Sequence, residues 1–144
     1  MKTNRLFLTL AMTLCLALGN IGMAEAGKKS DMRVKYVLQN IGVKRDVQTQ
    51  LKPLLVAYLA EKKAANKAYD DMKDKLKPSI DGGTLTEKQA QNLLNAKWAA
   101  AEKELQVKKQ YETKFRTVLS AKKTYLCFDL LNDKKSKMMG NEDD

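Results

Sequence analysis

Apolar residues recur at spacings of three and four along nearly the whole chain after Ser30, and this is the period of an amphipathic α-helix. The pattern predicts four helices, over Asp31–Ile41, from about Lys44 to Leu76, from Thr86 to about Leu119, and over Ala121–Asn132. No stretch alternates with the period of two that is typical of a β-strand. We therefore expect an all-α protein, a hairpin of two long helices with a short helix at each end.

Glycine and proline residues mark where the predicted helices end. Gly42 ends the first helix, and we expect Pro78 to end the second, with a loop over residues 79–83. Pro53 lies inside the second helical pattern, where it costs a backbone hydrogen bond. It either bends that helix or places the start of its straight part near Lys52.

The second long helix begins with a helix-cap motif made of Leu85, Thr86 and Gln89. The Thr86 hydroxyl is placed to accept a hydrogen bond from the Gln89 backbone N–H. The Gln89 side chain can in turn accept one from the Thr86 N–H, which makes a capping box. Leu85 stands before the cap, where it is placed to pack against Ala90 one turn later. A helix start this close to a helix stop indicates that two long helices meet here.

Two helices of about 30 residues are each about 45 Å long at 1.5 Å per residue. A compact globule of this size has a radius of gyration of only about 13–14 Å, so we expect an elongated molecule. A thin hairpin buries little core per residue, and small chains already bury a small share of their surface. Self-association is the simplest source of the missing burial, so we expect a homodimer.

Residues 1–26 have the layout of a secretory signal peptide. Lys2 and Arg5 form a basic start, residues 6–18 are apolar, and an A-x-A cleavage site follows at residues 24–26. The apolar run is short for a membrane span, although a retained anchor is the alternative. We expect export and cleavage, and no integral membrane anchor.

Cleavage leaves a helical domain over residues 27–132 and a tail over residues 133–144. The tail is charged, contains Gly140 and has no apolar period, so we expect it to be disordered.

The chain is strongly basic. Its net charge of +10 becomes +9 without the signal peptide, which carries two basic residues and one acidic one. On a cytosolic protein this charge suggests nucleic acid, but export argues against that partner. It favours acidic polypeptides, anionic lipid headgroups or lipopolysaccharide, and a well-solvated lysine-rich surface is the alternative.

The sequence lacks the residues that most catalytic and metal sites use. It contains no histidine, the commonest general base and metal ligand, and no glycine-rich phosphate loop. Cys127 is the single cysteine of the mature chain, so no intramolecular disulfide forms. Its apolar neighbours favour a buried thiol, and an intermolecular bridge is the alternative. We expect no enzyme activity, no cofactor and no metal site.

Charged residues interrupt the apolar stripes of both long helices near the middle of their length. They are Glu61 and Lys62 in the first long helix and Lys97, Glu104, Lys108 and Glu112 in the second. Two interpretations fit this pattern. Either the middle of the hairpin is an open surface of mixed character, or these side chains extend outward from a continuous core.

The segment Leu85-Thr86-Glu87-Lys88-Gln89, in a small basic helical chain behind a signal peptide, resembles the L-T-x-x-Q motif of the Spy/CpxP-like family of periplasmic proteins. That family usually carries the motif twice, and here the second region, residues 43–48, lacks the threonine and the glutamine register. Residues 114–123 are also similar to the family's closing turn into a last helix. The likeness covers residues 31–132.

The resemblance implies a periplasmic, antiparallel dimer with a concave basic face. It implies an ATP-independent chaperone that binds unfolded or misfolded envelope proteins, or alternatively a signalling adaptor that binds a sensor-kinase domain, or a metal-stress regulator. A purely structural envelope protein is a third possibility. For the chaperone, we expect clients to be held at the middle of the hairpin, on Tyr58, Lys62, Lys97, Trp98, Leu105 and Lys108.

Overall fold

The computed structural model describes residues 27–138, and helices joined by short turns account for nearly all of them. The helices are α2 (Gly27–Asn40), α3 (Arg45–Asp81), α4 (Glu87–Phe115), α5 (Ala121–Asn132) and α6 (Lys134–Met138). No residue of the described range lies in a β-strand. The prediction of an all-α protein is therefore confirmed, with five helices in place of the four expected.

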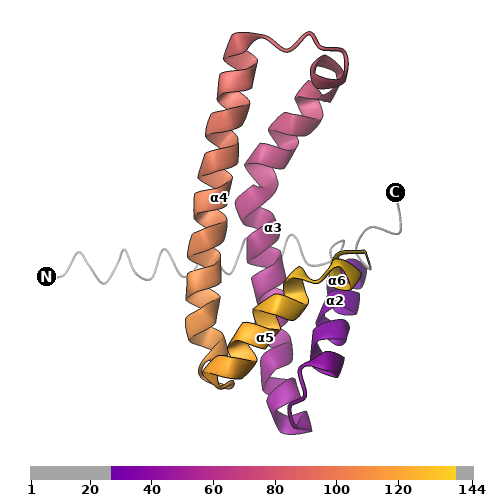
Figure 1. Ribbon diagram of the computed structural model, residues 1–144, viewed down its shortest axis with the longest axis vertical. Coiled ribbons are helices and arrows are strands. Elements are labelled where there is room, and N and C mark those ends of the chain that lie inside the picture. Colours follow the sequence, from indigo (N-terminus) through magenta and orange to yellow (C-terminus); the bar gives the residue numbers. More distant parts are fainter. Residues whose placement is uncertain (1–26, 139–144) are drawn as a thin grey trace, which may run out of the picture.

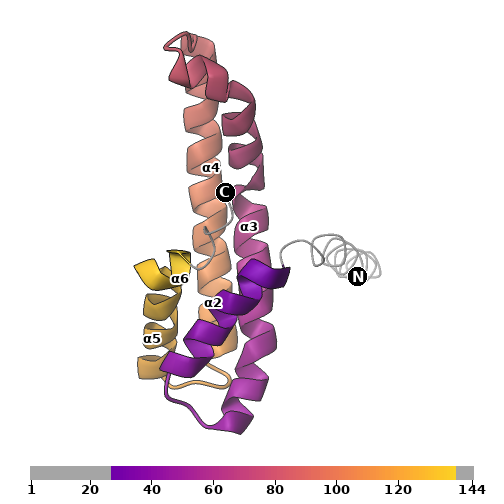
Figure 2. The same cartoon turned by 90° about the vertical axis from the view of Figure 1, so that its right-hand side faces the viewer.

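The two long helices, α3 and α4, run antiparallel and form an elongated hairpin (Figure 1). With 37 residues, α3 is about 55 Å long at 1.5 Å per residue. The short helices α2, α5 and α6 pack against one side of the hairpin, over its lower half only (Figure 2). We call this lower end the base and the end that carries the α3–α4 loop the tip.

The hydrophobic core lies at the base. The buried apolar residues that form it are Val34, Val37, Ile41, Leu51, Leu55, Tyr58, Leu59, Tyr111, Phe115, Leu119, Cys127 and Leu131. Between residues 60 and 110, by contrast, Ala100 is the one apolar residue that is buried. The base is thus a packed helical domain, whereas at the tip α3 and α4 bury each other's apolar side chains only in part.

The capping box at the start of α4 is present. The Gln89 backbone N–H donates to Thr86 Oγ1 at 3.2 Å, and the Thr86 N–H donates to Gln89 Oε1 at 3.0 Å. Two of the N–H groups that a helix start leaves without partners are satisfied in this way.

Thr86→Ala should lower the free energy of unfolding by about 1 kcal/mol, because it removes the side-chain cap. We expect faster amide hydrogen exchange over residues 87–90. Thr84→Ala is the matched control, since the Thr84 hydroxyl makes no hydrogen bond within the described chain. Unchanged exchange over residues 87–90 in Thr86→Ala would show that the cap does not hold the helix start.

The expectation that Pro78 ends the second helix is wrong, because α3 continues to Asp81. The stop is set by Gly83, whose φ of 67° is left-handed and suits glycine. The Thr84 N–H donates to the Ser79 carbonyl at 2.9 Å and the Gly83 N–H to the Ile80 carbonyl at 3.3 Å, which is a Schellman motif. Pro53 also lies within α3, which begins earlier, at Arg45.

The second long helix ends at Phe115, about one turn before the expected end near Leu119. The chain then turns tightly, with the Val118 N–H donating to the Phe115 carbonyl at 3.0 Å. Ser120 caps the next helix by accepting from the Lys123 N–H at 3.2 Å, and α5 has the predicted bounds.

The expectation of disorder from residue 133 onward is wrong for its first part, because Lys134–Met138 forms α6. Two residues of α2 hold this segment in place. Arg33 donates to the Leu131 carbonyl at 2.9 Å and to Ser136 Oγ at 3.3 Å, and Tyr36 donates to Asp133 Oδ2 at 2.7 Å.

The rest of the expected tail, residues 139–144, lies outside the described residues, as does the predicted signal peptide, residues 1–26. In the described part of the chain, no helix is apolar enough over a sufficient length to cross a membrane.

Cys127 is a buried thiol in the core of the base. Burial raises its pKa to about 12, and the thiolate is the reactive form. We expect a small thiol reagent to modify Cys127 slowly in the native protein and fast after unfolding. Rapid native labelling, or a disulfide-linked dimer on a non-reducing gel, would contradict this assignment.

Candidate functional site

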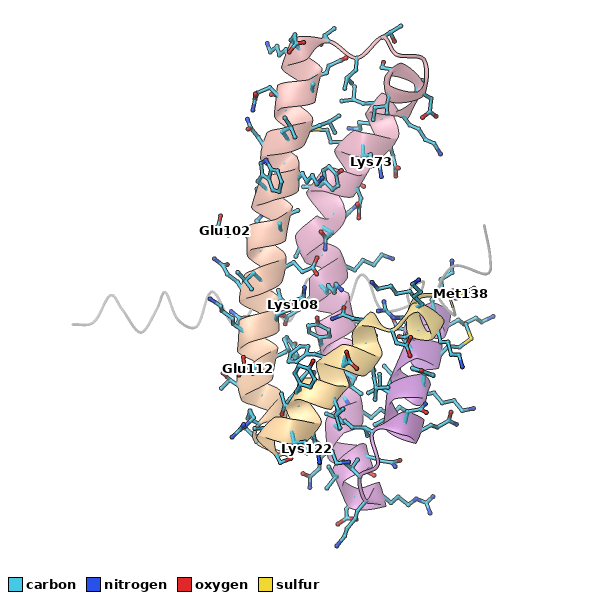
Figure 3. All side chains as sticks on the ribbon, viewed as in Figure 1. Lys73, Glu102, Lys108, Glu112, Lys122 and Met138 are labelled. Atoms are coloured by element: carbon cyan, nitrogen blue, oxygen red, sulfur yellow. The ribbon has the colours of Figure 1, made fainter. Side chains whose placement is uncertain are left out.

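A cluster of polar side chains joins α3 and α4 just above the core. Glu104 of α4 forms ion pairs with Lys62 of α3 at 3.4 Å and with Lys108 at 2.9 Å, and it accepts a hydrogen bond from Asn66 at 2.9 Å. We call these four residues the polar clasp. Of the charges that interrupt the two apolar stripes, Lys62 and Glu104 are therefore paired across the helices, and Lys108 pairs with Glu104 within α4. Figure 3 shows Lys108 on the side of α4 that faces α3.

The clasp stabilises the ionised form of Glu104. Partial burial by itself would raise the pKa of this carboxyl group. The hydrogen bonds from Lys108 and Asn66, together with the positive charges of Lys62 and Lys108, outweigh burial and hold the pKa at about 2. For Lys62, burial is the dominant influence and lowers its pKa.

A second polar contact lies one turn nearer the core. The Tyr111 hydroxyl donates to Glu61 Oε1 at 3.0 Å, and the ring of Tyr111 packs edge-on against Tyr58 with centroids 5.4 Å apart. Tyr58 is only 2% exposed. A client therefore cannot contact Tyr58 in this structure, so its place among the expected client-binding residues is a wrong assignment.

An apolar stripe is exposed on α4 toward the tip. Leu94, Trp98, Ala101 and Leu105 follow one another at spacings of four, three and four, so they lie on one face of the helix. Leu94 is 45% exposed, Trp98 61% and Leu105 51%. We call these four residues the exposed stripe. The principal neighbour of α4 is α3, and the stripe lies on a part of α4 that the other helices leave open.

A lysine side chain lies next to the exposed stripe. The Lys97 ammonium lies 5.4 Å from the centroid of the Trp98 ring, within the range of a cation–π contact. A positive charge is thus held directly beside the most exposed aromatic ring of α4.

The structure divides the six expected client-binding residues into two groups. Lys97, Trp98 and Leu105 lie on or beside the exposed stripe, whereas Tyr58, Lys62 and Lys108 belong to the core or the polar clasp. Leu94 and Ala101 complete the stripe and were missed. Their spacing to Trp98 and Leu105 is the signal in the sequence that could have identified them.

Two further features of residues 27–138 bear on other types of site. No three His, Cys, Asp or Glu side chains come together there in a metal-binding group. A shallow groove of about 270 Å³ lies between α3 and α4, lined by Glu61, Ala64, Ala65, Lys103, Gln106, Val107 and Gln110. Its carboxylate, Glu61, already accepts the hydrogen bond from Tyr111.

Comparison of the chain with protein-family models, with curated proteins and with solved structures finds no match. The likeness to the Spy/CpxP-like family therefore rests on the motif at Leu85–Gln89 and on the layout of the helices.

Proposed function

We propose that this protein is an ATP-independent chaperone that holds partly unfolded proteins on the exposed stripe of α4. The observation that carries the proposal is the exposure of Leu94, Trp98 and Leu105 along a single helix face. Exposed apolar side chains that gather in one place mark interaction sites, whereas scattered ones need no explanation.

The chemistry of this surface suits weak and general binding. Leucine and tryptophan side chains make non-directional contacts with any apolar segment. Lysines such as Lys97 attract acidic chains over a longer range and speed the encounter. Contacts of this kind release a client without a nucleotide-driven step, because no interlocking geometry has to be undone.

We place this activity in the periplasm, where the clients are unfolded or misfolded envelope proteins. Two features of the sequence support that location: the signal-peptide layout of residues 1–26 and the resemblance of Leu85–Gln89 to the Spy/CpxP-like motif. Export also separates the protein from ATP, which fits a chaperone that uses none.

We further propose an antiparallel homodimer with a concave basic face, as the resemblance implies. The sparse burial of the tip supports it, since residues 60–110 contribute Ala100 alone to the buried apolar residues. Light scattering on the purified protein should give twice the chain mass. A monomer across the concentrations at which the protein is active would contradict the dimer.

The proposed function is tested by aggregation assays with several unrelated unfolded proteins in the absence of ATP. We expect suppression of aggregation at near-stoichiometric ratios, and we expect the double variant Trp98→Gln, Leu105→Gln to lose it. Tyr125→Gln is the matched control, because Tyr125 is 71% exposed but lies on α5, outside the stripe.

Two outcomes would overturn the proposal. Failure of the native protein to suppress aggregation of any client would exclude a chaperone. Tight binding of one partner, such as a sensor-kinase domain, without suppression would assign the protein to signalling instead.

A further inference from the structure

A cluster of basic residues occupies the end of the base. It comes from two connections that are far apart in the sequence but lie at the same end of the molecule, the α2–α3 turn and the α4–α5 turn (Figure 1). The exposed members are Lys44, Arg45, Lys114, Arg116 and Lys122. Figure 3 shows Lys122 at this end. We call these five residues the basic end.

The fold holds the two turns together. The Lys123 ammonium, which is half-buried, donates to the carbonyl of Ile41 at 2.7 Å and so ties the start of α5 to the turn after α2. Ser120 fixes the first turn of α5 by accepting from the Lys123 N–H. The cations of the two turns are therefore brought together by packing, although the two groups are 69 residues or more apart along the chain.

The charge of the basic end is largely unbalanced. Among residues 27–138, none of its five members forms an ion pair. The acidic residues nearest along the chain are Asp46 and Glu112, both exposed. Helices α3 and α5 begin at this end while α2 and α4 end there, so their dipoles oppose one another and side-chain charge decides the field.

Within residues 27–138, the large apolar side chains that are exposed lie elsewhere. They are Met32, Ile80, Leu94, Trp98, Leu105, Tyr125 and Met138, and none belongs to either turn of the basic end. A surface of this composition attracts anions but has few apolar side chains that could insert into the hydrocarbon layer of a membrane. The Lys114 ammonium also lies 4.4 Å from the centroid of the Tyr111 ring.

We propose that the basic end binds the phosphate headgroups of an anionic membrane surface. Clusters of four to eight Lys and Arg residues bind anionic lipid in this way, with a contribution from each charge. The basic end is formed by turns and helix ends that project outward, which suits a flat layer of headgroups. Peptide recognition generally uses a groove or a sheet edge instead, so we favour lipid over an acidic polypeptide.

This contact would orient the molecule. With the basic end of one protomer on the membrane, the long axis of its hairpin points away from the membrane and its tip projects into the surrounding compartment (Figure 2). The exposed stripe would then remain free to hold clients near the membrane, a consequence that rests on the proposed function. Binding to lipid does not depend on it.

The test is co-sedimentation of a chain of residues 27–144, which contains every helix that the structure describes. The vesicles are phosphatidylglycerol mixed with phosphatidylethanolamine, compared with phosphatidylcholine alone. We expect binding to the anionic vesicles only, and weaker binding as salt is added, because salt screens exposed charges. The triple variant R45Q, R116Q, K122Q should bind roughly a hundredfold more weakly.

The matched control is the triple variant K63Q, K75Q, K88Q, which removes the same charge from exposed lysines away from the base. It should bind as the native protein does, within about twofold to threefold. If the first triple variant fails to fold, the single variants R45Q, R116Q and K122Q replace it, each with an expected loss of about fivefold.

Three results would overturn the proposal. The native protein could fail to bind anionic vesicles, both triple variants could lose binding equally, or the basic end could bind polyglutamate but not the vesicles. Suppression of aggregation in solution is measured on the same variants. A protein that binds lipid but does not suppress the aggregation of any client would contradict the proposed function, and the proposed lipid binding would still hold.

Discussion

Phe115→Ala should lower the free energy of unfolding by about 3–5 kcal/mol, the usual cost of removing a buried aromatic side chain. The Phe115 ring is fully buried. Its centroid lies 6.0 Å from that of Tyr58, 5.9 Å from Tyr111 and 5.4 Å from Phe128. The substitution therefore opens a cavity where α3, α4 and α5 meet. Since the free energy of unfolding of a small domain is only about 5–15 kcal/mol, this single substitution removes a large part of the protein's stability.

The measurement is urea denaturation followed by circular dichroism. The matched control is Trp98→Ala on the same helix, which removes a larger ring that is 61% exposed and should cost less than about 1 kcal/mol. Equal losses in the two variants would mean that the core does not lie at the base.

Glu104→Gln should destabilise the protein by about 1–3 kcal/mol at neutral pH, because it leaves the half-buried ammonium of Lys62 without its ionic partner. The side chain of Glu104 is 20% exposed, so solvent screens the pair only in part. Glu102→Gln is the matched control on the same helix, since Glu102 is exposed and Figure 3 shows it on the outer side of α4. We expect that control to change stability by less than about 0.5 kcal/mol.

The same carboxylate predicts a pH dependence. The pKa of Glu104 is lowered from 4.5 to about 2 in the folded protein. A group with a lowered pKa adds stability above its unfolded pKa and loses that contribution as the pH falls toward its folded pKa. Stability should therefore decline between about pH 4.5 and pH 2.

Asp133 acts in the same direction, because the hydrogen bond from Tyr36 lowers its pKa. The difference between the curves of the native protein and Glu104→Gln isolates the part due to Glu104. If the two curves run parallel from pH 5 to pH 2, the polar clasp contributes nothing to stability.

Local signals in the sequence were enough to predict much of the fold. The start of α5 follows from Ser120, whose hydroxyl caps the helix, and the start of α4 from the pair Thr86 and Gln89. The prediction that α3 ends at Pro78 is wrong because the left-handed Gly83, and not the proline, ends the helix. A proline within a helix removes one backbone N–H donor, and the helix can continue past that missing hydrogen bond. A glycine in the left-handed conformation instead turns the chain out of the helix.

Contacts between residues that are far apart along the chain could not be predicted from the sequence. Helix α6 has no apolar period of its own, and Arg33, about 100 residues earlier, donates hydrogen bonds to Ser136 of α6 and to the Leu131 carbonyl at the end of α5. The same holds for the polar clasp, because the sequence shows charges within two apolar stripes but not that Lys62 and Glu104 face each other. Of the residues expected to bind clients, Trp98 and Leu105 are exposed, whereas Tyr58, which was expected on the surface, is buried. That clients bind on Trp98 and Leu105 stays a prediction.

The fluorescence of Trp98 tests the central claim most directly, because Trp98 is the single tryptophan of the chain and lies on the exposed stripe. An unfolded client that lacks tryptophan is titrated into the native protein. We predict a shift of the emission to shorter wavelength, saturating at the ratio that suppresses aggregation. A shift that appears on concentrating the protein alone would assign the stripe to contact between copies. Emission that stays constant while aggregation is suppressed would show that clients bind elsewhere and would contradict the account.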